Sequence, residues 1–408
     1  MSSRNPSRLT RSLNDRLVID LLLEHGPLDR PTLARLTGLS KPSVADLVGR
    51  LLESGLVEEI GEGPSTRRGP NAMLYGLTGG LAAVAGVELQ PDHAQASIAD
   101  VNGSELGAVN VPIRPDESPS ELVARALRQA AEPSSIDIGD LTTAVVGTPG
   151  IVDPSGDMSF VWGQPEWTGG QLARMHDALG IPVRFENDIN LAAIAERRLG
   201  RAVDAEAFAL FKCDEGVGAA IMLGSQLVRG SHGAAGEIGY VPDLAWEQRS
   251  AGDYNEGLQS VAGARGLAAA LADLGLADLS PAAVLAPGPD DTGPDGRDAV
   301  PAELRQRFLL EVARRLAFGV VSVCAVIDPE LIVLVGEIAT AGGDRLAEAV
   351  GSRVAQTSPF RPAVVVSGLG HDAVVSGAVT TALDSARDEI YGVAPVFVRS
   401  APAIRRTP

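Results

Sequence analysis

The chain has 408 residues, of which 45% are hydrophobic and 21% are charged, and its formal net charge is -18 at pH 7. This size and composition exclude a single small module and a disordered tail, and they predict two or three domains. No apolar run reaches the ~18 residues that cross a bilayer, and the first residues lack the apolar core of a signal peptide, so we expect a cytoplasmic protein with no membrane partner.

The negative charge is unevenly distributed along the chain. Residues 1–77 contain ten Lys or Arg and nine Asp or Glu, whereas residues 78–408 contain 24 basic and 43 acidic residues. Strong acidity opposes indiscriminate binding to nucleic acid or anionic lipid. The N-terminal segment is therefore the part that we expect to approach a polyanion.

The N-terminal segment begins with the pattern of two helices. Leucines recur along one face of the first predicted helix at Leu9, Leu13, Leu17 and Leu21. Gly26-Pro27 ends this run. Asp29 is placed to cap a short second helix, and Gly38 supplies the turn that follows it.

A third helix and a hairpin complete the segment. Ser40 is placed to cap the helix, and Gly55 lies just beyond its end. The apolar stripe of this helix comprises Val44, Leu47, Val48, Leu51 and Leu52. Two short strands, 56–60 and 73–77, follow around a Gly- and Pro-containing loop. This order predicts a winged helix-turn-helix.

Polar residues off the apolar stripe are candidates for DNA contact. Lys41, Ser43 and Arg50 belong to the third helix, and Arg67 and Arg68 to the hairpin loop. The helix is expected to enter the major groove of a double-stranded operator while the loop arginines neutralise phosphates. A small helical protein-interaction domain with a solvated polar face is the alternative. The low charge of the segment predicts modest affinity per copy, so we expect a homodimer or homotetramer on a palindromic site.

The remaining chain shows two similar α/β patterns. The first has strands at 83–89, 93–100 and 105–111, a helix at 120–131 and a strand at 142–146. The second has strands at 208–211, 218–223 and 226–228, helices at 259–273 and 303–326, and a strand at 331–335. Such duplication predicts two α/β halves around a cleft. The predicted domains are 1–78, 82–200 and 201–400, the last being the part expected to dimerise.

Three motifs in this body resemble those of the ROK family of repressors and sugar kinases. They are Gly147-Thr148-Pro149-Gly150, Glu186-Asn187-Asp188-Ile189-Asn190, and the glycine-rich run from Gly230 to Gly239. The resemblance spans nearly the whole chain. It implies an actin-like, ribonuclease-H-like α/β fold with a sugar site in the cleft and, because a winged helix precedes it, a sugar-responsive transcription factor.

The resemblance and the chemistry of the motifs select five ligand-binding candidates: Gly150, Asn187, Asp188, Glu237 and Tyr240. Carboxylates and an amide suit vicinal hydroxyls, and in sugar kinases of the family the Asp that matches Asp188 is the general base. Tyr240 is placed to stack on a sugar face.

Each candidate also has a structural alternative. Asp188 and Asn190 can simply cap the helix that follows them. Glu237 can be a salt-bridged loop carboxylate, Gly150 can serve only the backbone of a turn, and Tyr240 can be part of the core.

The phosphate-binding loops depart from the kinase pattern. Kinases of the family have Asp-x-Gly-Gly-Thr where this chain has Glu88-Leu89-Gln90-Pro91-Asp92, and Gly-Thr-Gly-x-Gly where it has Cys213-Asp214-Glu215-Gly216-Val217-Gly218. The first loop has lost its glycines, and Pro91 removes an amide donor. The second places two carboxylates where a polyphosphate would lie. We therefore expect no enzymatic activity and no cofactor.

Many relatives hold a structural zinc ion with a His and three Cys. Here the His position is Tyr240, and residues 241–266 contain no cysteine. We expect no metal.

The leading hypothesis is a repressor of carbohydrate-metabolism genes that is controlled by a sugar or sugar phosphate. An ATP-dependent sugar kinase with an appended DNA-binding domain is the alternative. A constitutive DNA-binding protein whose body only dimerises is a third possibility.

Overall fold

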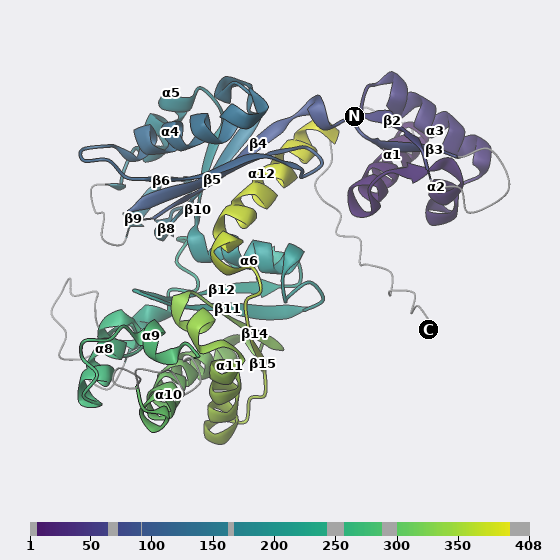
Figure 1. Ribbon diagram of the computed structural model, residues 1–408. Helices are drawn as coiled ribbons and strands as arrows, with labels where there is room; N and C mark the ends of the chain where they lie inside the picture. The colour runs from purple at the N-terminus through teal and green to yellow at the C-terminus, as the bar shows by residue number, and fades with distance from the viewer. Residues whose placement is uncertain are drawn as a thin grey trace, which may run out of the picture.

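The computed structural model describes residues 6–63, 72–90, 92–161, 167–242, 257–287 and 300–391. An N-terminal head lies beside a body of two lobes, and the C-terminal helix runs from between the lobes towards the head (Figure 1). Within these residues no helix is both long and apolar enough to cross a membrane.

The head contains three helices and a three-stranded antiparallel sheet, in the order α1 (Pro6–His25), β1 (Leu28–Asp29), α2 (Arg30–Thr37), α3 (Lys41–Glu53), β2 (Val57–Glu62) and β3 (Met73–Leu77). The predicted caps are present: Asp29 accepts a hydrogen bond from the Thr32 N–H at 2.7 Å, and Ser40 accepts one from the Ser43 N–H. Gly38 ends α2 with a φ of 70°, a conformation that glycine adopts without strain.

The first lobe is a five-stranded sheet in the order β10-β7-β4-β5-β6. Its elements are β4 (Ala83–Leu89), β5 (His93–Asp100), β6 (Glu105–Pro112), α4 (Pro119–Ala131), β7 (Thr143–Thr148), α5 (Gln171–Leu179) and β10 (Val183–Asn187). Side chains alternate along each strand. Ala85 and Val87 pack in a core with α4, whereas Val84 packs on the other face with the C-terminal helix. A two-stranded ribbon, β8 (Gly150–Val152) and β9 (Met158–Val161), follows β7.

The second lobe repeats the first, with the sheet order β13-β12-β11-β14-β15. Its strands are β11 (Ala207–Cys213), β12 (Val217–Leu223), β13 (Gln226–Leu227), β14 (Leu331–Val335) and β15 (Ala363–Val366). Its helices are α7 (Leu258–Ala262), α8 (Ala264–Asp273), α9 (Pro281–Leu285), α10 (Ala302–Ile327) and α11 (Glu337–Thr357). In both lobes the first three strands are antiparallel. A fourth strand then pairs in parallel with the first strand, and a fifth pairs in parallel with the fourth. The predicted duplication is therefore visible in the strand pairing.

Two helices join the lobes. Helix α6 (Asp188–Leu199) packs against β11 with one face and against α12 (Ala373–Tyr391) with another. Although α12 falls in the stretch that the sequence assigns to the second half, it covers the first sheet. Two glycines permit this approach: a Cβ at Gly86 would lie 2.5 Å from the Val379 nitrogen, and one at Gly377 would lie 1.9 Å from the Leu191 carbonyl oxygen.

The last turns of α12 also contact the base of the head. Tyr391 packs against the core of the head. Arg387 donates to the carbonyl oxygen of Val101, and the neighbouring Asn102 side chain donates to the carbonyl oxygen of Leu77 at 3.2 Å. The head is therefore attached to the body through packed side chains as well as through the short connection at residues 78–82.

Substitution Gly377→Ala is expected to destabilise the body, because the added methyl group would collide with α6. Overpacking of this kind lowers the free energy of unfolding by ~1–3 kcal/mol. Gly351→Ala in α11 is the matched control, since its Cβ would lie 3.5 Å from the Val364 side chain of β15, which is an ordinary van der Waals contact. Urea denaturation checks the pair, and an equal loss of stability in both variants would contradict the close packing of α6 and α12.

Candidate functional site

Five charged side chains gather between the lobes, where β4, β10 and β11 end. Glu88 comes from β4, Asp188 from the start of α6, and Lys212 and Asp214 from the end of β11. Glu237 follows the glycine-rich run. These five side chains form one cluster. Lys212 interacts electrostatically with Asp188, Asp214 and Glu88, and Glu237 interacts with Asp188.

The centre of the cluster is an ion pair between the lobes. The Lys212 ammonium lies 2.8 Å from Oδ2 of Asp188, whose side chain is 4% exposed. Burial alone would lower the pKa of Lys212, but the carboxylates of Asp188, Asp214 and Glu88 raise it above its ordinary value. One ammonium is thus held charged by several carboxylates. Sequence reasoning missed this role of Lys212, although it is one of only two lysines in the chain.

Asn187 and Gly150 are brought together at the first motif. Oδ1 of Asn187 accepts from the Asn190 N–H at 3.1 Å, and its Nδ2 donates to the Gly150 carbonyl oxygen at 2.8 Å. The capping alternative was therefore wrong about the residue, because Asn187 and not Asp188 or Asn190 caps α6. Asn187 positions the turn at Gly150 beside Asp188.

The glycine-rich run places Glu237 against the cluster. A Cβ at Gly233 would lie 1.9 Å from the Val152 carbonyl oxygen of the first lobe, and one at Gly236 would lie 1.9 Å from the Ala219 carbonyl oxygen of the second. The run therefore crosses between the lobes at a distance that only glycine permits. Burial, aided by Asp188, raises the pKa of Glu237 to about 7. A salt bridge would lower the pKa, which argues against the salt-bridge alternative for this residue.

Glu88 and Asp214 lie at the ends of β4 and β11, in the two stretches where the sequence departs from the kinase pattern. Burial raises the pKa of Glu88 to about 7, although the hydrogen bond from Gln90 opposes the rise. Burial also raises the pKa of Asp214 to about 6. The Asp214 carboxylate accepts from the Glu337 N–H at 2.6 Å. It thereby takes the position at the N-terminus of α11 that would suit an external anion.

The fifth ligand candidate, Tyr240, lies in a short 3-10 helix (Ile238–Tyr240) beyond Glu237 and is half-buried. Within the described ranges no group of three or more His, Cys, Asp or Glu side chains is placed to hold a metal ion. Residues 243–256, which form more than half of the cysteine-free stretch 241–266, lie outside the described residues. The absence of zinc stays a prediction.

The head presents a second candidate surface at the start of α3. Lys41 and Ser43 are exposed in its first turn, and the Ser43 hydroxyl lies 2.8 Å from that of Ser40. Arg50 lies two turns further on and is bound to Asp15 of α1 at 2.6 Å, so it is already engaged within the head. Arg67 and Arg68 lie outside the described residues.

Comparison with known proteins identifies the body. The ROK family model matches residues 84–385. The chain belongs to the ROK family.

Relatives by sequence include the xylose repressor of Caldicellulosiruptor bescii, which is 22% identical over 91% of this chain and 95% of its own length. The transcriptional dual regulator NagC of Escherichia coli is 25% identical over 57% of this chain, and the match spans 58% of its length. The match with NagC therefore spans less than two thirds of the length of NagC.

Solved structures share the fold. A ROK transcriptional regulator, a homolog of the E. coli MLC protein, matches 92% of this ROK chain and 96% of its own, with a TM-score of 0.66 and 20% identity. The ROK hexokinase of Thermus thermophilus matches 75% of this chain and 99% of its own, with a TM-score of 0.60 and 25% identity. These matches establish the actin-like α/β architecture of the body.

Glu88→Gln is expected to stabilise the protein in alkaline solution. The pKa of Glu88 rises from 4.5 to about 7 on folding, so the stability that its protonation supplies is lost as the pH rises through this window. Glutamine stays neutral, and we expect a gain of ~1–3 kcal/mol at pH 8 and a smaller one, below about 1 kcal/mol, at pH 5.

Chemical denaturation at the two pH values measures this difference. Glu105 is exposed on β6, so Glu105→Gln is the control and should leave the free energy of unfolding unchanged at both pH values. A Glu88→Gln protein less stable than the parent at pH 8 would show that the ionised carboxylate is favourable.

Proposed function

We propose that this ROK protein is a DNA-binding transcriptional repressor of carbohydrate-metabolism genes, and that a sugar or sugar phosphate in the cleft between the lobes controls it. The proposal rests chiefly on one observation, which is that a helical head and a ROK body occur in one chain. The match to the regulator covers 92% of the chain, whereas the match to the hexokinase covers 75%. The names of the sequence relatives, xylose repressor and NagC, support the same function.

The head, residues 1–78, is proposed to be a winged helix-turn-helix. The glycine turn between α2 and α3, the exposed first turn of α3 and the β2–β3 hairpin support this proposal. Lys41 and Ser43 would face base edges, and Arg67 and Arg68 would contact phosphates from the hairpin loop. Arg50 is also proposed to contact DNA, and its partly exposed pair with Asp15 would orient it.

Lys41→Gln is expected to weaken binding to an operator fragment and to reduce the slope of log affinity against log salt by about one. Arg201→Gln removes the same charge from an exposed site on the body and should leave both quantities unchanged. Fluorescence anisotropy of the full chain, with a labelled DNA fragment that flanks its own gene, measures the affinity and its salt dependence. An unchanged slope in Lys41→Gln would exclude a phosphate contact by this residue.

The cleft is proposed to bind the effector without phosphorylating it. Asp188, Asn187, Glu237, Gly150 and Tyr240 would contact the sugar. The residue that matches the general base of the kinases, Asp188, is bound to Lys212. The carboxylate of Asp214 fills the N-terminus of α11 and would repel a nucleotide phosphate.

The effector would act by closing the lobes and changing the spacing of two heads in a homodimer or homotetramer on a palindromic operator. It has to bind one arrangement better than the other, and residues from both lobes meet at Asp188 and Glu237. A coupling free energy of ~1–3 kcal/mol would change DNA affinity by ~5–150-fold.

Xylose, glucose and N-acetylglucosamine provide a direct test of the cleft. The sugar that binds is expected to raise the melting temperature of the parent. At pH 8, where Glu237 is ionised, Glu237→Gln should weaken binding of that sugar at least about tenfold, because the loss of one charged hydrogen bond costs ~1.5–3 kcal/mol. Glu105→Gln should bind it normally. Equal binding by both variants would place the sugar elsewhere.

A sugar kinase with an appended head is the competing function, and the hexokinase match favours it. Sugar-dependent release of ADP from ATP distinguishes the two. We expect none from the parent chain. A turnover that Asp188→Asn abolishes would establish the kinase.

A further inference from the structure

A second pocket lies outside the cleft, beneath α12. Its walls come from β10, the second half of α6, the β12–β13 hairpin and four residues of α12, and it encloses about 460 Å³. None of the five cleft residues that form the charged cluster lines it. Its volume falls in the ordinary range for small-molecule sites.

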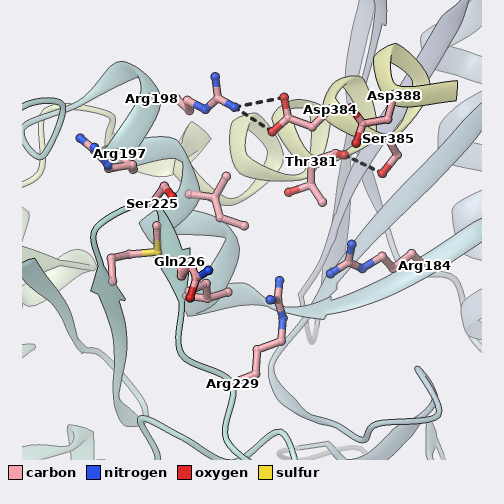
Figure 2. Close-up of a pocket in the computed structure, with 13 residues that line it drawn as sticks. Arg184, Arg197, Arg198, Ser225, Gln226, Arg229, Thr381, Asp384, Ser385 and Asp388 are labelled. Carbon is pink, nitrogen blue, oxygen red and sulfur yellow. Dashed lines mark hydrogen bonds and ion pairs between the residues drawn. The ribbon is translucent and has the colours of Figure 1, made fainter. Parts of the chain in front are cut away.

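The pocket is basic, although the chain as a whole is strongly acidic. Four arginines line it against two aspartates. Two of them, Arg184 and Arg229, each contact the buried carboxylate of Glu186 through a guanidinium Nη2 atom, at 3.3 and 2.7 Å. They keep 46% and 42% of their side chains exposed. Figure 2 shows both guanidinium groups directed into the open space below α12.

The opposite wall offers polar groups for the rest of a ligand. Thr381 and Ser385 of α12 line it, and their hydroxyls donate to carbonyl oxygens of α12, so they can act only as acceptors for a ligand. The side chain of Gln226 extends from the hairpin (Figure 2). Ile194 and Leu227 supply apolar surface between them. Paired guanidinium groups facing hydroxyl and amide groups suit a phosphate ester that carries a small polar body.

We propose that this pocket binds a small phosphorylated metabolite, whose phosphate group is held by Arg184 and Arg229 and whose remainder lies against Thr381, Ser385 and Gln226. The anion replaces no protein group, because Glu186 neutralises only one of the two guanidinium charges. The carboxylates of the cleft make it a less favourable place for a phosphate group than this pocket.

The pocket also has a path to the head, and this step rests on the proposed function. Arg198 holds Asp384 of α12 through both carboxylate oxygens, at 3.1 and 2.9 Å. One turn further on, Oδ1 of Asp388 is buried and has no hydrogen-bond partner among the described residues. Tyr391 then packs in the core of the head. A phosphate that draws Arg198 away from Asp384 would leave two carboxylates adjacent on α12 and shift its contact with the head.

Binding is tested by calorimetry on the full chain, with inorganic phosphate and glucose 6-phosphate as probes and glucose as the uncharged comparison. Gln226→Glu places a carboxylate at an exposed site in the pocket without altering the core. We expect it to weaken both phosphorylated probes by roughly tenfold or more, and Arg184→Gln to do the same.

Gln306→Glu is the matched control, because Gln306 is exposed in another arginine-lined groove between α8, α10 and α11. It should bind both probes as the parent does. Absence of binding at millimolar phosphate, or a loss in Gln306→Glu without a loss in Gln226→Glu, would overturn the proposed site.

The coupling is tested separately on an operator fragment. Glucose 6-phosphate should change the affinity of the parent for DNA about fivefold or more and leave that of Gln226→Glu unchanged. Failure of the parent to bind DNA would refute the proposed function and leave the calorimetric result standing. Normal DNA binding that the ligand does not alter would refute the coupling alone.

Discussion

The contact between the Lys212 ammonium and the Asp188 carboxylate determines what the cleft can do. Carboxylates that converge between two lobes repel one another, and their desolvation adds to this cost. A single ammonium at 2.8 Å from Asp188 offsets part of it. The same contact occupies the oxygen that a phosphoryl-transfer base would need for a substrate hydroxyl. In the proposed function, this one contact would both stabilise the cleft and disfavour phosphoryl transfer in it.

Helix α12 connects the two lobes and the basic pocket to the head. It covers the first sheet, lies against α6 at a distance that Gly377 permits, lines the basic pocket and ends in the core of the head (Figure 1). In the proposed coupling, a small displacement of this helix would alter the position of the head relative to the lobes, because packed interfaces change between discrete arrangements.

Much of the fold could be predicted from the sequence because its signals are local. The caps at Asp29 and Ser40, the glycine turn at Gly38 and the alternating strands all act within a few residues. Helix α11 and strand β15 were not predicted. The path of α12 back onto the first sheet also escaped prediction, because it depends on two glycines, Gly86 and Gly377, that are far apart in sequence.

The candidate site was predicted only in part. Asp188 and Glu237 are conspicuous in their motifs, but the pairing of Asp188 with Lys212 arises from long-range β pairing that no spacing encodes. The basic pocket likewise combines arginines from separate elements.

Footprinting of the full chain on the DNA flanking its own gene, titrated with sugars, tests the central claim most directly. The account predicts protection of a two-fold symmetric sequence that one sugar relieves or strengthens. A chain that protects no sequence in this DNA, or whose footprint no sugar alters, would contradict it.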